Sequence, residues 1–256
     1  MLTSLQNPLV KQMRKLQRAK YRKQQGVFLL EGTHLLQEAC AVNWPLEVAC
    51  CTPIWCEKYP LLWQQLQGQA RIELVSADVL GAITTTNTPD GVVAIATSQT
   101  TTAPKITSLG LVLETIQDPG NLGTMIRTAA AAGAEGLLLS ADTVDPEHPK
   151  VLRASAGAWF HIDIGLCENL LQAVSQYQQQ GFQILATRPD AEQSYWKCDL
   201  QQPTLILIGN EGAGLSAALS DLAHTQVKIP TAPAIESLNA GVSAALLLYE
   251  AQRQRS

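Results

Sequence analysis

The chain has 256 residues, a formal net charge of −4 and 46% hydrophobic residues. This length is enough to bury one large or two modest hydrophobic cores without crosslinks. No apolar run approaches the roughly 18 residues that a membrane-spanning helix needs. The six cysteines form no Cys-x-x-Cys pair, so we expect buried, reduced thiols and no metal site. No secretory signal is visible, and a cytoplasmic location is expected.

Positive charge is concentrated near the N-terminus. Seven of the 18 basic residues precede the first acidic residue, Glu31, and they are Lys11, Arg14, Lys15, Arg18, Lys20, Arg22 and Lys23. Asn7-Pro8 is a helix-start signal, and apolar residues recur at helical spacing as far as Leu16, which predicts a basic amphipathic helix within residues 1–25. Such uncompensated cations favour an arm that contacts RNA. A solvated basic face or a mitochondrial presequence are the alternatives.

From Gly26 onward, short strand-like runs alternate with helical ones. Strands are predicted at 27–30, 46–51, 72–75 and 92–96, with a helix near 34–41. These elements indicate a small α/β domain that spans residues 1–97. The next stretch, 98–108, is rich in threonine and lacks an apolar period, which is typical of a linker.

The remainder, 109–256, is predicted to form a second domain. Its strand-like runs are continuous and apolar, and they occur at 109–113, 137–139, 183–186, 205–208 and 227–229. Helical stretches separate most of them. Continuous apolar strands between helices predict a parallel sheet covered on both faces. In such a sheet, ligands bind beyond the carboxyl ends of the strands, so the loops that follow them are the places to look for chemistry.

The first such loop begins after the strand at 109–113. Asp118-Pro-Gly is a turn signal, and Asn121 is expected to cap the helix that follows. Arg127 lies four residues after Gly123, so its side chain should lean over backbone that carries no side chain. That arrangement would present a cation above exposed backbone. The alternatives are that Arg127 is a solvated helix arginine and that Asn121 is an ordinary helix cap.

The second loop follows the strand at 205–208 and reads Gly209-Asn-Glu-Gly-x-Gly. It lacks the Lys-Ser/Thr pair of a phosphate-binding P-loop, and its spacing misses Gly-x-Gly-x-x-Gly. Glu211 would repel a pyrophosphate but suits a cationic or hydroxyl-bearing ligand. The loop therefore favours a sulfonium cofactor over a nucleoside triphosphate.

The third loop runs from Ile229-Pro230 to Ser237-Leu-Asn239 and enters a helix that is predicted to reach about Gln252. Ser237 or Asn239 could act simply as the helix cap. One apolar face comprises Leu238, Val242, Leu246 and Tyr249, and a second set, Ala245, Leu247 and Leu248, extends it around the helix. A helix that is apolar on most sides is usually buried on most sides, here with a partner subunit as one candidate cover.

Together the three loops closely resemble the three motifs of the SpoU/TrmH branch of the SPOUT methyltransferases. The match lies in Asn121-x-Gly-x-x-x-Arg127, in Gly209-Asn-Glu-Gly-x-Gly-Leu215, and in Ile229-Pro followed by Ser237-Leu-Asn239. Residues 10–97 also resemble the L30e-like substrate-binding domain of many relatives, with Leu29-Leu-Glu-Gly32 as the best marker.

The resemblance implies an α/β fold in which the parallel sheet of the C-terminal domain contains a deep trefoil knot and a smaller L30e-like domain precedes it. It also implies a homodimer with active sites near the subunit interface, and S-adenosylmethionine as cofactor without a metal. The residues expected to hold the cofactor are Leu207, Gly209, Ile229 and Leu238. The expected activity is methyl transfer to a ribose 2′-hydroxyl of structured RNA, with ribosomal RNA favoured over transfer RNA.

By the same resemblance, the catalytic residues are Arg127, Asn121, Glu211 and Asn239. A guanidinium is essentially never deprotonated, so we expect Arg127 to hold the adjacent phosphate and stabilise alkoxide charge. Proton removal is left to phosphate, water or Glu211. Asn121 and Asn239 are expected to organise hydrogen bonds.

The sequence departs from the family pattern at two places. Glu114-Thr115 stands where Asp and a small residue are common, and Ala240-Gly241 replaces bulkier residues. The segment 147–155 resembles a family segment that faces RNA. Two alternative functions are an RNA-binding protein of the same fold that has lost catalysis, and a dinucleotide-dependent oxidoreductase, which the missing fingerprint disfavours.

Overall fold

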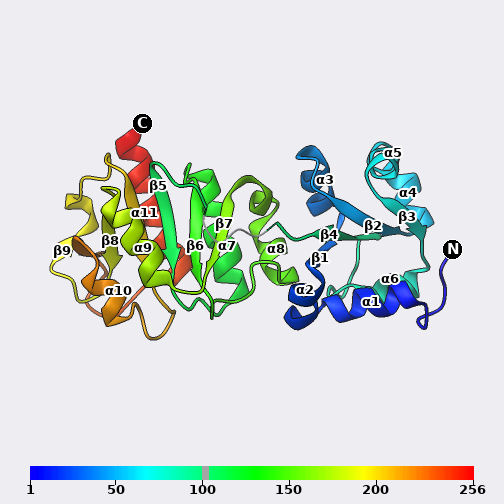
Figure 1. Ribbon diagram of the computed structural model, residues 1–256, viewed down its shortest axis with the longest axis horizontal. Helices are drawn as coiled ribbons and strands as arrows, with labels where there is room; N and C mark the ends of the chain where they lie inside the picture. Colours follow the sequence, from blue (N-terminus) through cyan, green and yellow to red (C-terminus); the bar gives the residue numbers. More distant parts are fainter. Residues whose placement is uncertain (100–103) are drawn as a thin grey trace. The chain divides into compact units, whose positions relative to one another are not determined.

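The computed structural model describes residues 1–99 and 104–256, which form two compact units (Figure 1). The first unit comprises Met1–Gln99 together with Glu147–Phe160, and the second comprises the other described residues. Sequence patterns did not separate the segment 147–160 from the domain on either side of it. The predicted linker includes residues 100–103, which lie outside the described residues. Among the described helices, none is long and apolar enough to cross a membrane.

The first unit is built on a mixed sheet with the strand order β1-β4-β2-β3. β4 is antiparallel to both of its neighbours, and β3 is parallel to β2. The strands are β1 (Val27–Glu31), β2 (Leu46–Cys51), β3 (Arg71–Leu74) and β4 (Val92–Thr97). The helices are α1 (Pro8–Leu16), α2 (Ala19–Gln25), α3 (Thr33–Ala41), α4 (Pro53–Lys58), α5 (Pro60–Gln69), α6 (Ala77–Ile83) and α8 (Pro149–Ser155), with the 3₁₀ helix η1 (Ala158–His161) following α8.

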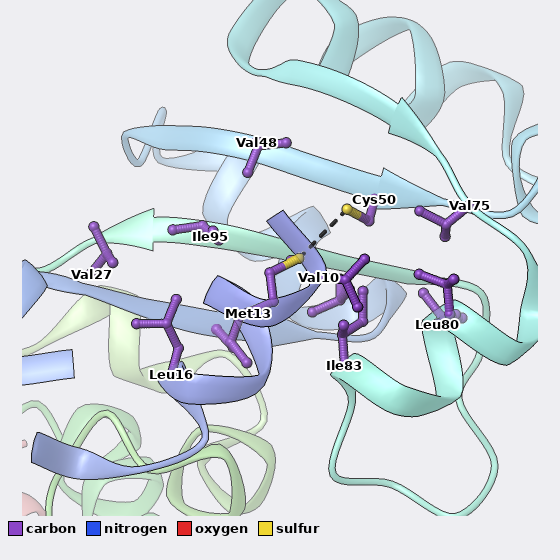
Figure 2. Packing of buried hydrophobic residues seen from close by; sticks show 13 residues of the cluster. Val10, Met13, Leu16, Val27, Val48, Cys50, Val75, Leu80, Ile83 and Ile95 are labelled. Carbon is purple, nitrogen blue, oxygen red and sulfur yellow. Dashed lines mark hydrogen bonds between the residues drawn. The ribbon is translucent and has the colours of Figure 1, made fainter. Parts of the chain in front are cut away.

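The basic N-terminal segment forms two helices and is part of the core of this unit. Asn7 caps α1 by accepting a hydrogen bond from the backbone N–H of Leu9, and Pro8 occupies the first turn. Figure 2 shows Val10 and Met13 of α1 packed among side chains of the sheet, and Cys50 Sγ lies 3.6 Å from Met13 Sδ. The arm predicted from the sequence is therefore a packed helix whose outer face carries the cations.

Arg22 differs from the other basic residues of this segment. Its exposed fraction is 1%, and its guanidinium donates to the carbonyl oxygen of Leu16 at 2.8 Å. The carbonyls of the last turn of a helix lack partners within the helix, so an arginine at this point completes the end of α1. Arg22 is therefore not available to a polyanion at the surface. The other six are exposed.

The second unit contains a sheet of seven described strands in the order β7-β6-β5-β10-β8-β11-β9, and every recorded pairing is parallel. The strands are β5 (Leu109–Leu113), β6 (Gly136–Ser140), β7 (Asp163–Cys167), β8 (Gln183–Thr187), β9 (Gln193–Ser194), β10 (Thr204–Ile208) and β11 (Thr225–Lys228). The helices are α7 (Pro119–Ala131), α9 (Leu170–Gln179), α10 (Ala217–Asp221) and α11 (Ala240–Arg255), with the short η2 (Tyr195–Lys197).

This sheet confirms the predicted α/β class and parallel sheet. β7 and β9 were not predicted, because the first begins with Asp163 and is interrupted by Gly165, and the second has two residues. The trefoil knot stays a prediction from the resemblance.

The order of the strands reverses at β5. The chain passes from β5 outward through β6 to β7, and it later returns to place β10 on the other side of β5. Leu113 pairs with Ile208 at the carboxyl ends of these two strands, so the loops that follow them start side by side. Such a reversal is where open parallel sheets bind ligands. α11 packs against α7 and β10, which brings the start of the C-terminal helix to the same edge (Figure 1).

Candidate functional site

The loop after β5 turns into α7 through an aspartate cap. The carboxylate of Asp118 accepts a hydrogen bond from the backbone N–H of Asn121 at 2.8 Å, and Pro119 begins the helix. Asn121 is therefore not the cap that the sequence predicted. Proline at the first helical position places the cap one residue earlier, at Asp118. Asn121 lies inside the first turn, and its side-chain amide does not cap the helix.

Glu211 links the glycine-rich loop after β10 to this helix start. Its carboxylate accepts hydrogen bonds from the backbone N–H of Gln117 at 3.2 Å, the backbone N–H of Asp118 at 3.1 Å and Nδ2 of Asn121 at 3.1 Å. Partial burial works to raise the pKa of Glu211, but these donors together outweigh it and hold the pKa below the ordinary value. A carboxylate with three such donors is a weak base.

Asn239 ties the third loop to the same point. As the cap of α11, its Oδ1 accepts from the backbone N–H of Gly241 at 2.9 Å and of Val242 at 3.3 Å. Its Nδ2 donates to Oδ1 of Asn121 at 2.9 Å. The cap role is thus confirmed for Asn239, and the same side chain also joins Asn121 and Glu211 in one hydrogen-bonded chain.

Arg127 lies on an exposed face of α7, one turn after Gly123. Within residues 1–99 and 104–256, no hydrogen bond or ion pair of its guanidinium is recorded. The structure therefore brings three of the four predicted catalytic side chains into contact and records no contact of the fourth with them. An unpaired guanidinium at the surface remains available to an anion.

A cavity of about 440 Å³ adjoins this network at the carboxyl ends of β8, β10 and β11. Three predicted cofactor residues, Gly209, Ile229 and Leu238, line it. Leu207 does not, because its side chain is fully buried in the core of the unit. The lining residues that sequence patterns missed include Thr187, Arg188, Lys228, Glu236 and Ser243.

The shape of the glycine-rich loop depends on Gly209. A Cβ at this position would lie 2.1 Å from the carbonyl carbon of Gly214 and 2.2 Å from the backbone nitrogen of Leu215. Two backbone hydrogen bonds between Asn210 and Gly214, at 3.0 and 2.9 Å, close the loop. Gly209 is thus required by the fold of the loop itself, in addition to any approach of a ligand.

The cavity is suited to a nucleoside-sized ligand that carries positive charge. Its volume falls within the roughly 300–1,000 Å³ typical of small-molecule sites. Ile229 and Leu238 offer apolar surface for a base, whereas Glu211 and Glu236 supply negative charge. Arg188 and Lys228 also line the cavity. The Arg188 guanidinium is paired with Asp190 at 2.8 Å, so the two carboxylates of the lining stand against the single cation Lys228.

Comparison with known proteins gives two family matches. The SpoU rRNA Methylase family matches residues 108–249, and the MRM3-like substrate binding domain matches residues 7–94. The chain is 48% identical, over 99% of its length and 94% of the relative's, to an uncharacterized tRNA/rRNA methyltransferase of Synechocystis. It is 32% identical to the 23S rRNA (guanosine(2553)-2′-O)-methyltransferase RlmP of Bacillus subtilis, over 97% of each chain. Among solved structures, the AdoMet-bound rRNA methyltransferase from Sinorhizobium meliloti superposes with a TM-score of 0.88 at 30% identity, covering 98% of this chain and 97% of that one.

Proposed function

This chain belongs to the SpoU rRNA methylase family, and we propose that it transfers a methyl group to a ribose 2′-hydroxyl of ribosomal RNA. It is an S-adenosylmethionine-dependent RNA methyltransferase. The observation that carries the proposal is the hydrogen-bonded chain of Glu211, Asn121 and Asn239, which joins three motifs beside a nucleoside-sized cavity. The choice of ribosomal RNA is supported by RlmP, which methylates 23S rRNA.

The cofactor is proposed to lie in the cavity beyond β8, β10 and β11. Gly209, Ile229 and Leu238 would contact its adenosine part, since they combine backbone groups with apolar surface. When bound, S-adenosylmethionine supplies a methyl group that positive sulfur has already activated. The task left to the protein is to orient the ribose hydroxyl and to make it more nucleophilic.

Arg127 is proposed to act on the RNA. Its guanidinium cannot take up a proton from the hydroxyl, because it is already protonated at any physiological pH. It can hold a phosphate through two parallel hydrogen bonds and stabilise the negative charge that grows on the 2′-oxygen. Its exposure and its lack of a recorded partner in the described chain support this role.

Glu211 is proposed to organise the site and not to remove the proton. Its carboxylate accepts hydrogen bonds from the loop before α7 and from Asn121 in the first turn of that helix, and these donors hold its pKa below the ordinary value. A base of that kind has little tendency to accept a proton near pH 7. The proton of the ribose hydroxyl would instead pass to phosphate or water.

The first unit is proposed to bind the RNA backbone through the outer face of α1 and α2. Six exposed cations lie on this segment, with no acidic residue among them: Lys11, Arg14, Lys15, Arg18, Lys20 and Lys23. Cations of this density attract phosphates without reading the base sequence. The match of residues 7–94 to a substrate-binding domain supports the assignment.

A second copy of the chain is proposed to cover the outer face of α11. Val242 is 48% exposed, Leu246 36% and Tyr249 50%, and they line a largely apolar groove of about 460 Å³. Apolar surface gathered at one place usually marks an interface. The groove is also lined by Thr124 of α7 and by Gly241, so a partner there would lie close to the network at Asn121 and Asn239. The dimer is proposed to work in the cytoplasm.

The direct test is methyl transfer from radiolabelled S-adenosylmethionine to purified ribosomal RNA and to transfer RNA, with 2′-O-methyl positions mapped afterwards. We expect label in ribosomal RNA at one ribose. Label in transfer RNA alone would contradict the proposal that ribosomal RNA is the substrate. Stoichiometric cofactor binding without transfer to either RNA would contradict the activity and favour an RNA-binding protein that has lost catalysis.

A further inference from the structure

Thr115 has an unusual backbone conformation at the edge of the site. It lies two residues after Leu113, the last residue of β5, and its φ is +55°, in the left-handed region. Glycine and asparagine tolerate this region, whereas a side chain branched at Cβ clashes there with the backbone. Sterically disfavoured residues persist only where their surroundings hold them, and they gather at functional sites.

Every polar group of Thr115 is bonded. Its Oγ1 donates to Asp142 Oδ2 at 2.8 Å, its backbone N–H donates to Ser140 Oγ at 2.8 Å, and its carbonyl accepts from Nδ2 of Asn210 at 2.8 Å. Ser140 Oγ in turn donates to Asp142 Oδ1 at 2.6 Å. The left-handed backbone at Thr115, called the bend below, is therefore fixed on one side by residues at and just after the end of β6 and on the other by the glycine-rich loop.

The bend determines where the neighbouring groups of the site lie. Two and three residues after Thr115, the backbone N–H groups of Gln117 and Asp118 donate to the carboxylate of Glu211. On its other side, Asn210, which immediately precedes Glu211, is anchored to the Thr115 carbonyl. One residue before it, the Glu114 carboxylate accepts from the backbone N–H of Ser216 at 2.7 Å. A change at Thr115 would move both ends of the contact between the two loops.

We infer that Thr115 and Asp142 form a positioning pair for methyl transfer. The pair holds the loop before α7 and the glycine-rich loop in the relative position that the hydrogen-bonded chain of Glu211, Asn121 and Asn239 requires. The inference rests on the proposed function, because that chain is part of the proposed active site. Neither residue of the pair lines the cofactor cavity, and within the described residues no contact of either with Arg127 is recorded; the pair reaches the lining through the Thr115 carbonyl, which accepts from Asn210. It acts through the residues between them, and the hydroxyl of Thr115 is the group that carries the effect.

The test separates strain from positioning with two substitutions at one residue. Thr115→Gly relieves the left-handed backbone and removes the hydroxyl, so we expect an unchanged or raised melting temperature together with a kcat lowered about tenfold or more. Thr115→Ser keeps the hydroxyl, and we expect kcat close to that of the wild type. The dissociation constant for S-adenosylmethionine should change by less than about twofold in both. Asp142→Asn should lower kcat in the same direction as Thr115→Gly.

The matched control for Asp142→Asn is Asp163→Asn, an exposed aspartate at the amino end of β7, whereas Asp142 follows the carboxyl end of the neighbouring strand β6. We expect it to leave kcat unchanged. A purely structural role for the pair would lower the melting temperature of Asp142→Asn while kcat of the folded protein stayed normal. Normal kcat in Thr115→Gly would overturn the inference.

Amide hydrogen exchange gives a readout that does not depend on catalysis. Gln117 and Asp118 should be protected in the wild type and should lose protection in Thr115→Gly, because their acceptor Glu211 is displaced. If the wild type has no transferase activity, the proposed function fails, and exchange alone then decides the inference. Unchanged protection in Thr115→Gly would overturn the inference even in an active enzyme.

Discussion

The glycine-rich loop offers a sharp test because two of its glycines differ in the space around them. In Gly209→Ala, the new Cβ would meet the backbone of Gly214 and Leu215 at 2.1 and 2.2 Å. No side-chain rotation relieves a contact with backbone. In Gly212→Ala, by contrast, the recorded neighbour is the side-chain oxygen of Asn210 at 3.6 Å, which is ordinary van der Waals contact.

The cost of Gly209→Ala follows from what must open. The two backbone hydrogen bonds that close the loop would be broken or stretched, at about 0.5–1.5 kcal/mol each, so the expected loss in the free energy of unfolding is about 1–3 kcal/mol. For a protein of this size each kcal/mol lowers the melting temperature by about 2–4 °C. We therefore expect a fall of roughly 2–12 °C. Displacement of Glu211 and of the cavity wall should also weaken cofactor binding about tenfold or more.

Scanning calorimetry and isothermal titration with S-adenosylmethionine measure the two effects. Gly212→Ala is the control for stability, and we expect its melting temperature to lie close to that of the wild type. If Gly209→Ala and Gly212→Ala behaved alike, the close approach of Gly209 to the far side of its own loop would not be what this residue is needed for.

Three further predictions concern charge and assembly. Because the folded-state pKa of Glu211 is lowered, its contribution to stability is present above the unfolded pKa of about 4.3 and is lost as pH falls through the folded pKa. The difference in melting temperature between the wild type and Glu211→Gln should therefore be constant near neutral pH and shrink in acid. A kcat profile that titrates with Glu211 near pH 7 would contradict its assignment as an organiser. Leu246→Glu should convert a dimer to monomers in analytical ultracentrifugation, whereas Leu171→Glu, at a similarly exposed leucine of α9, should not. An unchanged oligomeric state in both variants would exclude α11 as the interface. Replacing Arg14 and Lys15 together by Gln should weaken RNA binding and reduce the slope of log affinity against log salt by about two; an unchanged slope in filter binding would mean that this face does not contact phosphates.

The sequence predicted the sheet well because its signals are local. Apolar runs such as 109–113 and 205–208 are long enough to be recognised by themselves, and β5 and β10 begin within one residue of the predicted positions. β9 could not be found in this way, since its two residues owe their strand conformation to pairing with β11. Which strands are neighbours, and hence which loops meet, depends on pairing between distant segments that no local pattern encodes.

The site residues were found by motif, but their contacts were not. The motif predicts Asn121 as a helix cap, whereas Pro119 at the first helical position makes Asp118 the cap. The Asn121 amide is thereby left to bridge Glu211 and Asn239. The sequence marks Thr115 as a departure from the family pattern. No local pattern predicts its left-handed backbone or its hydrogen bond to Asp142, because the two residues are 27 positions apart.

Burial separates Arg22 from its basic neighbours in a way that composition cannot. All seven N-terminal cations look alike in the sequence, yet Arg22 points inward to the end of α1 while the other six face outward. The segment 147–160 is a similar case. Its residues follow β6 along the chain, but the Arg153 guanidinium donates to Glu31 at 2.9 Å inside the first unit. Glu31 itself belongs to the Leu29-Leu-Glu-Gly32 marker, and its carboxylate accepts the Arg153 hydrogen bond that holds the segment 147–160 to the first unit.

Arg127 carries the central claim, and Arg127→Ala is the variant that tests it most directly. Single-turnover methyl transfer to ribosomal RNA should be measured for this variant beside titration with S-adenosylmethionine, so that chemistry and cofactor binding are separated. We expect transfer to be lost, by about a hundredfold or more, with the cofactor dissociation constant changed less than about threefold. Transfer at close to the wild-type rate would contradict the account.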